Sequence, residues 1–218
     1  LSSRSKVRVL HKTLFFRKML NRPVVIKRVL KPDFFYDVNK TIHHHMRWAI
    51  NNYSEGPGDS ANDPVSWGVV HKNCEPIIYK AATIIKLKIL RHIRQKIQIC
   101  KIHYNAQTSG QASKFHHDFD QELCWTFVLF TEKHWDTQWG GEFVCQHPLS
   151  KEYFHTPYIP NSGVLIPSSW QHYGQSPSAI TDKVRTTLAI CYMEAETLED
   201  ELEHYKSKGE IDTLHEFV

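Results

Sequence analysis

The sequence lacks several features that would place it in a specialised class of protein. No apolar run approaches the roughly 18 residues that a membrane-spanning helix needs, and the basic opening segment has no signal-peptide core. Internal repeats and low-complexity tracts are also absent. Hydrophobic residues at 41% and charged residues at 23% exclude a disordered or collagenous chain. The 218 residues therefore predict one soluble globular domain that makes no use of a membrane.

Cysteine is too sparse for a disulfide framework. The five cysteines are odd in number, widely spaced and never arranged as C-x-x-C: Cys74, Cys100, Cys124, Cys145 and Cys191. This pattern favours free thiols in a reducing compartment, so we expect a cytoplasmic protein.

The net charge of +4 is unevenly distributed along the chain. Residues 1–31 contain ten Lys or Arg and no acidic residue, whereas residues 194–218 contain nine acidic residues and two Lys. The charge pattern predicts a basic N-terminal segment over 1–22, a nearly neutral domain over 23–193, and an acidic, helical tail over 194–218.

The first part of the domain has helical patterning. The segment Val24–Leu30 predicts a strand, and the following run from Pro32 to Ile50 predicts an amphipathic helix, since Pro and Asp suit a first turn. A second helix is expected from Pro76 to Lys96, with apolar residues on one face and basic residues on the other. Residues 54–66 are rich in Gly, Pro, Asp and Ser and predict a loop.

Short strands dominate the chain from about Gln98 onward. Eight strand-like runs are separated by turn residues: 98–104, 113–120, 123–131, 142–146, 152–159, 163–167, 170–174 and 184–193. Many short strands after two helices predict an α+β fold, in which the N-terminal helices buttress a β-sandwich or jelly roll.

Candidate metal ligands occur in two of these runs. In residues 114–120, KFHHDFD, alternation along a strand places His116 and Asp118 on one face and His117 on the other. A third candidate, His172, lies far downstream in SSWQHYG. Two imidazoles and one carboxylate are the facial triad of non-haem Fe(II) oxygenases, which leaves coordination positions open for cosubstrate and oxygen.

A candidate carboxylate-binding pair follows the distal histidine. Arg185 and Thr187 share a face of the predicted strand RTTLAICY, which begins thirteen residues after His172. A guanidinium fork beside a hydroxyl suits a buried carboxylate, because the fork binds both oxygens and neutralises their charge.

The order H-x-D, distal His, then R-x-T resembles the 2-oxoglutarate- and Fe(II)-dependent dioxygenases. The strand TFVLF at 126–130, the turn WDTQWGGEF at 135–143 and the approach PNSGVLIP at 160–167 are similar to the prolyl 4-hydroxylase branch. The resemblance covers residues 98–193, and 23–50 more loosely. It implies a double-stranded β-helix (jelly roll) core.

The same resemblance implies roles for individual residues. The triad would hold Fe(II), while Arg185 and Thr187 would bind the C5 carboxylate of 2-oxoglutarate and Tyr104 would donate to it. Phe130 stands where some relatives have a tyrosine hydroxyl. Lys183 shares the predicted strand face of Arg185 and is an alternative carboxylate binder.

The implied reaction is the oxidative decarboxylation of 2-oxoglutarate to succinate and carbon dioxide, coupled to hydroxylation of an unactivated C–H bond by O2. Fe(II), 2-oxoglutarate and O2 are the expected cofactors and cosubstrates, with ascorbate as a candidate reductant. Asp118 favours hydroxylation, because halogenating relatives replace this carboxylate with a small residue.

Three functions remain open from the sequence. The first is hydroxylation of prolyl residues in a peptide or protein, with Tyr104, Trp139 and Trp170 expected to contact the substrate. The second is oxidation of nucleic acid, favoured by the basic N-terminal segment and the basic helix face. The third is a degenerate jelly-roll binding module. The oligomeric state is not indicated.

Overall fold

The computed structural model describes seven parts of the chain: residues 21–45, 49–50, 67–70, 75–93, 96–111, 113–120 and 123–194. The predicted loop at 54–66, nearly all of the basic segment 1–22 and the predicted helical tail after Glu194 lie outside these described residues. No helix among the described residues has the length and apolar character needed to cross a bilayer.

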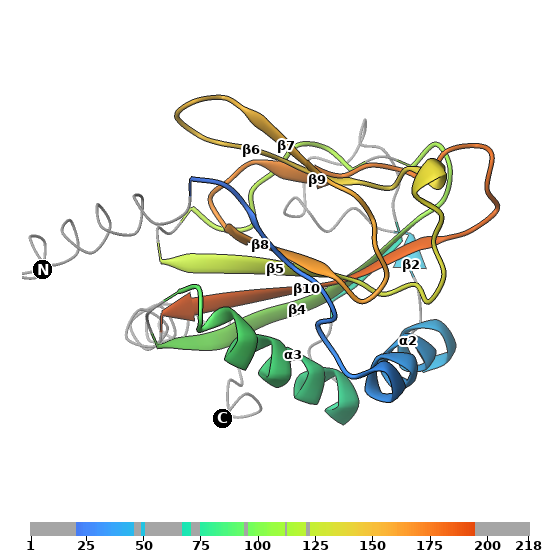
Figure 1. Ribbon diagram of the computed structural model, residues 1–218, viewed down its shortest axis with the longest axis horizontal. Coiled ribbons are helices and arrows are strands. Elements are labelled where there is room, and N and C mark those ends of the chain that lie inside the picture. Colours follow the sequence, from blue (N-terminus) through green and yellow to red (C-terminus); the bar gives the residue numbers. More distant parts are fainter. Residues whose placement is uncertain are drawn as a thin grey trace, which may run out of the picture.

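Two α-helices, one short 3-10 helix and ten strands make up the described fold (Figure 1). In chain order they are β1 (Val24–Ile26), α2 (Pro32–His45), β2 (Ala49–Ile50), β3 (Trp67–Val70), α3 (Pro76–Ile89), β4 (Ile97–Gln107), β5 (Cys124–Phe130), the 3-10 helix η2 (Thr137–Trp139), β6 (Phe143–Gln146), β7 (Tyr153–Thr156), β8 (Gly163–Pro167), β9 (His172–Gly174) and β10 (Arg185–Glu194). The predicted α+β class is confirmed.

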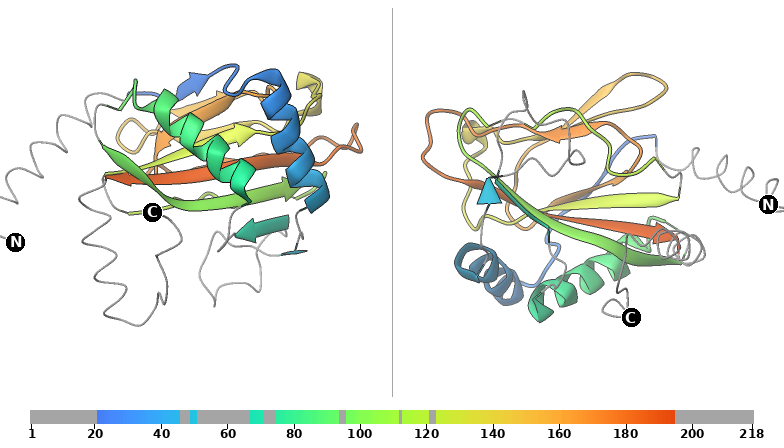
Figure 2. Two further views of the ribbon diagram at one scale, coloured as in Figure 1. Left: turned by 90° about the horizontal axis from the view of Figure 1, so that it is seen from below. Right: turned by 180° about the vertical axis from the view of Figure 1, so that it is seen from behind.

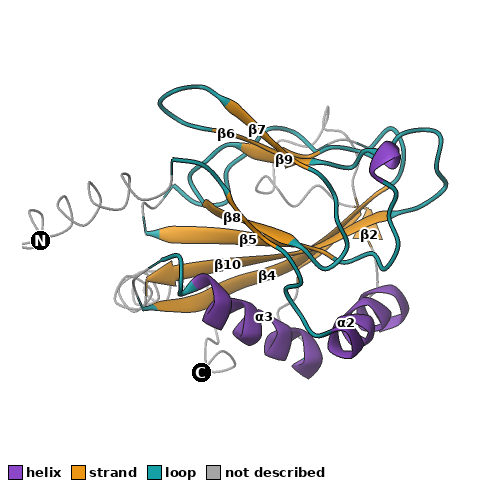
Figure 3. Ribbon diagram, viewed as in Figure 1, coloured by secondary structure: helices purple, strands orange, loops and turns teal. Residues whose placement is uncertain are grey.

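The strands form two antiparallel sheets. The larger sheet has the order β1-β8-β5-β10-β4-β3-β2, and the smaller has the order β7-β6-β9. The smaller sheet lies over one face of the larger one, and both helices cover the opposite face (Figures 1 and 2). The sheets thus make the expected jelly-roll core, and the helices support it from outside (Figure 3).

The main hydrophobic core lies between the larger sheet and the two helices. Its members alternate along the strands, as a sheet with two different faces requires. On β10 the helix-facing residues are Leu188, Ile190 and Tyr192, and the Tyr192 hydroxyl donates to the Ala82 carbonyl in α3 at 2.8 Å. The intervening residues of β10 face the smaller sheet, where the functional groups gather.

Three predicted boundaries differ from those in the structure. The strand expected over Val24–Leu30 ends at Ile26, because the amides of Val29 and Leu30 instead donate to Asn161. Helix α2 ends at His45 rather than continuing to Ile50, which already belongs to strand β2 (Ala49–Ile50). Helix α3 ends at Ile89 rather than Lys96, and residues 90–93 form turns.

Candidate active site

A polar pocket is lined by residues of both sheets. The space at this site, counted together with the open solvent at its mouth, amounts to about 410 Å³. The lining residues come from both sheets and from the segment before β5: His103, Asn105, Gln107, Ser113, His116, Asp118, Val128, Phe143, His172, Gly174, Arg185, Thr187 and Ala189.

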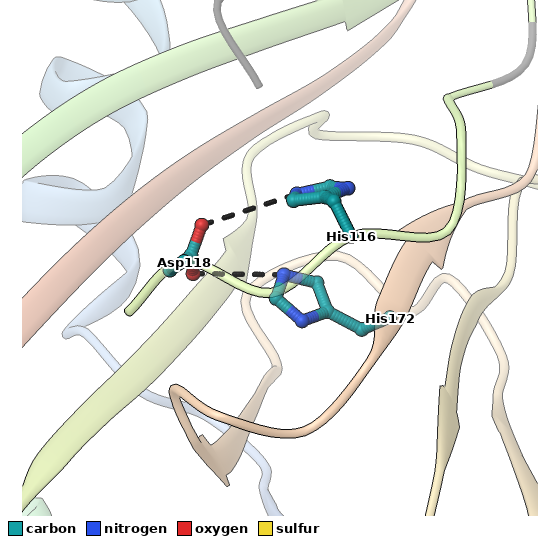
Figure 4. Close-up of side chains that lie close together, drawn as sticks. All are labelled: His116, Asp118 and His172. Carbon is teal, nitrogen blue, oxygen red and sulfur yellow. Dashed lines mark ion pairs between the residues drawn. The ribbon is translucent and has the colours of Figure 1, made fainter. Parts of the chain in front are cut away.

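Three predicted metal ligands converge in this pocket (Figure 4). One ligand atom from each of His116, Asp118 and His172 lies within 4.8 Å of the other two. Nε2 of His116 is 3.9 Å from Oδ1 of Asp118, and Nε2 of His172 is 3.5 Å from Oδ2. Among the described residues, these three form the only group of potential ligands at metal-binding distances.

The route by which the ligands converge differs from the sequence prediction. The expected strand over 113–120 is irregular, and only His116 makes a bridge, pairing with His172 through both backbone amides. The amide of Asp118 donates to the Ser168 carbonyl at 3.0 Å. These bonds fix the segment against the approach to β9, so the ligands meet without regular strand alternation.

The tautomers of both histidines suit metal binding. Nδ1 of His116 lies 2.9 Å from the Lys114 carbonyl, and Nδ1 of His172 lies 2.9 Å from the Trp170 carbonyl. A carbonyl oxygen can only accept, so in the neutral rings Nδ1 carries the proton and the Nε2 lone pair faces the shared space. Burial lowers the pKa of His172 to about 4, so its ring is neutral near pH 7.

Asp118 is held as a carboxylate by its surroundings. Burial would raise its pKa, but His172, His103 and His116, together with a hydrogen bond from Thr126, hold the pKa below its usual range. The Thr126 hydroxyl donates to Oδ2 at 2.6 Å. The donor set of two Nε2 atoms and one carboxylate therefore fits Fe(II), with three protein ligands and room for others.

Arg185 lies in the same pocket and is only 2% exposed. Its Nε donates to the Gly141 carbonyl at 2.7 Å, and its Nη1 donates to Oε1 of Gln107 at 2.8 Å. Burial lowers its pKa to about 10, so the guanidinium remains charged near pH 7. Among the described residues no carboxylate forms an ion pair with it.

The turn at 135–143 has a structural role in placing this arginine. Nε1 of Trp135 donates to the Gly140 carbonyl at 3.0 Å, and the next carbonyl, of Gly141, accepts from Arg185. Gly141 has a φ of +77°, and a Cβ there would lie 3.0 Å from the Trp135 ring and 3.2 Å from Cδ of Arg185. Glycine is therefore required by both backbone conformation and space.

The other predicted carboxylate-binding residues have different positions. Thr187 lines the pocket two residues beyond Arg185 on the same face of β10. Tyr104 is fully buried in the core on the helix-facing side of the larger sheet, and it does not line the pocket. Since successive strand residues face opposite sides, the expected role of Tyr104 is not supported.

Polar residues flanking Tyr104 on β4 were missed by the sequence reasoning. His103, Asn105 and Gln107 all line the pocket, and Nδ1 of His103 is buried without a hydrogen-bond partner among the described residues. Burial lowers the pKa of His103 to about 3. The alternation of these polar residues with Ile102, Tyr104 and Ala106 was the signal that could have identified them.

Lys183, the alternative cation, lies outside strand β10. Its side chain is 59% exposed and its Nζ is 3.6 Å from Oδ1 of Asp182. It does not line the pocket, and Arg185 is the one Lys or Arg side chain among the described residues that does. Phe130, which stands where some relatives have a tyrosine hydroxyl, is buried and stacks on Tyr158 with ring centroids 4.7 Å apart. Neither residue lines the pocket.

The expected aromatic contact surface is also wrong in part. Trp170 is 4% exposed and packs in the core formed with the smaller sheet, and Tyr104 is buried on the other side. Only Trp139 of the three expected residues is partly exposed.

No protein-family model matches the chain, and no curated protein matches it in sequence. Solved structures do match. SnoN, a non-heme alpha-ketoglutarate-dependent epimerase from nogalamycin biosynthesis, is 13% identical with a TM-score of 0.62, covering 85% of this chain and 84% of SnoN. A prolyl hydroxylase from Trichoplax adhaerens, in complex with a hypoxia inducible factor peptide fragment, is 14% identical with a TM-score of 0.63, covering 86% and 93%. The fold is that of the 2-oxoglutarate- and Fe(II)-dependent oxygenases.

A third match shows how varied this fold is in its ligands. HygX from Streptomyces hygroscopicus, with nickel and 2-oxoglutarate bound, is 9% identical with a TM-score of 0.59, covering 84% of this chain and 87% of HygX. The predicted jelly-roll core with N-terminal helices is confirmed. The matches include both prolyl hydroxylases and an epimerase of nogalamycin biosynthesis, so they do not distinguish the prolyl 4-hydroxylase branch.

Proposed function

We propose that this protein is a 2-oxoglutarate-dependent Fe(II) hydroxylase that acts on prolyl residues of a peptide or protein. The observation that carries the proposal is a buried, charged Arg185 in the same pocket as the His116, Asp118 and His172 cluster. A buried cation without a carboxylate partner is costly, and an anionic ligand would compensate it. A dicarboxylate with a 2-oxo group suits both parts of this pocket, because one carboxylate can pair with Arg185 while the 2-oxo acid end can bind a metal held by the triad.

Each part of the pocket has a distinct task in this proposal. The triad would hold Fe(II), which supplies O2 activation coupled to decarboxylation of the oxo acid. Arg185 binds and orients the far carboxylate, and Thr187 donates a hydrogen bond beside it. Thr126 holds one oxygen of Asp118 through the bond at 2.6 Å, which keeps that carboxylate in place and ionised.

The choice of a prolyl substrate rests on the resemblance of the strand at 126–130 and the turn at 135–143 to prolyl 4-hydroxylases. The Trichoplax adhaerens match supports it, because that prolyl hydroxylase is seen with a peptide. The ends of the chain, basic over 1–22 and acidic over 194–218, are expected to lie outside the catalytic domain.

The nucleic-acid alternative receives no support from the position of the basic helix. Helix α3 packs its apolar face on the larger sheet, on the side opposite the smaller sheet and the pocket (Figure 2). Lys80 of α3 and Arg91 in the turn that follows it are exposed, so nucleic acid bound to them would not approach the candidate iron site directly.

Succinate release tests the proposal. The purified protein is incubated with Fe(II), 2-oxoglutarate, ascorbate and a panel of proline-containing peptides, with each proline replaced by alanine in the matched controls. We expect a proline peptide to stimulate succinate formation and to gain one oxygen as hydroxyproline, detected by mass spectrometry.

Two other outcomes would redirect the proposal. Succinate release without any response to proline peptides, together with loss of nucleic-acid binding on removal of residues 1–20 and steep salt dependence, would favour the nucleic-acid reading. No binding of 2-oxoglutarate and no succinate under any condition would leave a jelly-roll binding module.

A further inference from the structure

Gln107, at the end of β4, has four hydrogen-bond partners around its amide group, one at the oxygen and three sharing the two N–H donors. It is 1% exposed. Its Oε1 accepts from Nη1 of Arg185 at 2.8 Å. Its Nε2 donates to the Gln111 carbonyl at 3.0 Å, the Ser113 hydroxyl at 3.1 Å and the Gly174 carbonyl at 3.0 Å. One buried amide therefore joins the arginine to two segments that lead to metal ligands.

These contacts fix which way the amide faces. The carbonyls of Gln111 and Gly174 can only accept, so they require the NH2 group of Gln107 on their side. A rotated amide would put two carbonyl oxygens against Oε1 and two donors against each other at Arg185. The oxygen must therefore face Arg185, and it leaves the guanidinium little freedom to turn.

The Gln107 amide is uncharged, and this matters as much as the direction in which its oxygen points. An amide oxygen satisfies one N–H of the guanidinium without cancelling its charge, whereas a carboxylate at the same position would form a buried ion pair. Gln107 therefore orients Arg185 and leaves its positive charge available to a ligand. Gly141 contributes in the same way through an uncharged carbonyl.

We propose that Gln107 is a positioning residue for cosubstrate binding, which holds Arg185 in place and reserves its charge for the far carboxylate of an oxo diacid. This inference rests on the proposed function, and it adds a residue that determines selection for a dicarboxylate. Gly174 is a necessary part of the arrangement, because a Cβ there would lie 2.8 Å from Nη1 of Arg185 and 2.9 Å from Oε1 of Gln107.

The test uses two substitutions of similar size, of which one adds a negative charge and the other adds none. Gln107→Glu keeps an oxygen toward Arg185 and adds a negative charge, and it also replaces the NH2 group facing the Gln111 and Gly174 carbonyls with an oxygen, so some loss of melting temperature is expected in this variant. Gln107→Met removes the hydrogen-bonding groups without adding charge. Gln146→Glu is the matched control, because Nε2 of Gln146 also donates to a backbone carbonyl, that of Lys151, but the residue does not line the pocket.

Binding of 2-oxoglutarate is measured by calorimetry on the full chain loaded with Mn(II), alongside the affinity for Mn(II) and the melting temperature. We expect Gln107→Glu to raise the Kd for 2-oxoglutarate by about thirtyfold or more, since its carboxylate competes for Arg185. Gln107→Met should raise it by about three- to tenfold through lost orientation. Gln146→Glu should match the unmodified protein, and Mn(II) affinity should be unchanged throughout.

The outcomes separate this inference from the proposed function. If the unmodified protein does not bind 2-oxoglutarate, the proposed function fails first. If it does bind, and Gln107→Glu binds equally well, the positioning role is wrong. A parallel loss of 2-oxoglutarate affinity, Mn(II) affinity and melting temperature would indicate a purely structural residue. A larger loss in Gln107→Met than in Gln107→Glu would refute the argument from charge.

Discussion

Replacement of Arg185 by methionine tests the central electrostatic argument. Methionine fills much of the same volume but carries no charge and donates no hydrogen bond. With the cation removed, the far carboxylate of 2-oxoglutarate would enter a buried site without a partner. Breaking a buried charge pair by removing one member costs about 3–5 kcal/mol, so the Kd for 2-oxoglutarate should rise by more than about a hundredfold.

The stability of the ligand-free protein should respond quite differently. Burial lowers the pKa of Arg185 to about 10, which corresponds to about 3 kcal/mol of destabilisation from the charged side chain. Its removal relieves that cost but leaves the oxygens of Gly141 and Gln107 without their donor, at about 1–3 kcal/mol each. Since these terms oppose each other, the free energy of unfolding should change much less than the binding energy.

Calorimetry with Mn(II)-loaded protein gives the Kd for 2-oxoglutarate, and urea unfolding gives the stability. Lys183→Ala is the control, because this lysine is 59% exposed and outside the pocket, and it should bind 2-oxoglutarate normally. Normal binding by Arg185→Met, or a comparable loss in Lys183→Ala, would show that the carboxylate anchor has been assigned to the wrong residue.

Three further predictions follow from other parts of the structure. Asp118→Ala should lose Mn(II) binding and turnover but remain folded, as checked by calorimetry and circular dichroism; retained turnover would rule out the triad. The metal-free protein should become less stable as the pH falls, because the unfolded chain binds protons that buried His172 and His103, with pKa values lowered to about 4 and 3, reject. The contribution of these two histidines to the free energy of unfolding is fully present above pH 6.5. Urea unfolding at pH 5 should show that the free energy of unfolding has fallen by about 2 kcal/mol per histidine. A free energy of unfolding that does not change with pH would contradict the burial of these side chains. Gly163→Ala should destabilise the fold by about 1–3 kcal/mol, because its Cβ would overlap the Phe127 ring, and an unchanged urea midpoint would refute this packing argument.

The residues that meet in the candidate site could be predicted from the sequence. Few residue types can bind Fe(II) or a buried carboxylate, so His116, Asp118, His172 and Arg185 were recognisable by type and order. The fold class was also predictable, because short alternating runs after two helical patterns allow few architectures. The polar alternation of β4 was present as well, although the resemblance to relatives directed attention to Tyr104 instead of its neighbours.

Only the tertiary structure decided how these residues meet. Gln107 and Arg185 are 78 residues apart in sequence, and their hydrogen bond exists because β4 and β10 pair in a register that places them opposite each other. The irregular segment before β5 reaches the site through bonds to His172 and Ser168, which no local propensity encodes. The sequence by itself determined which chemical groups were available and which strand faces they could occupy. Sheet pairing and stacking determined which groups became neighbours, because those contacts join residues whose proximity depends on the whole fold.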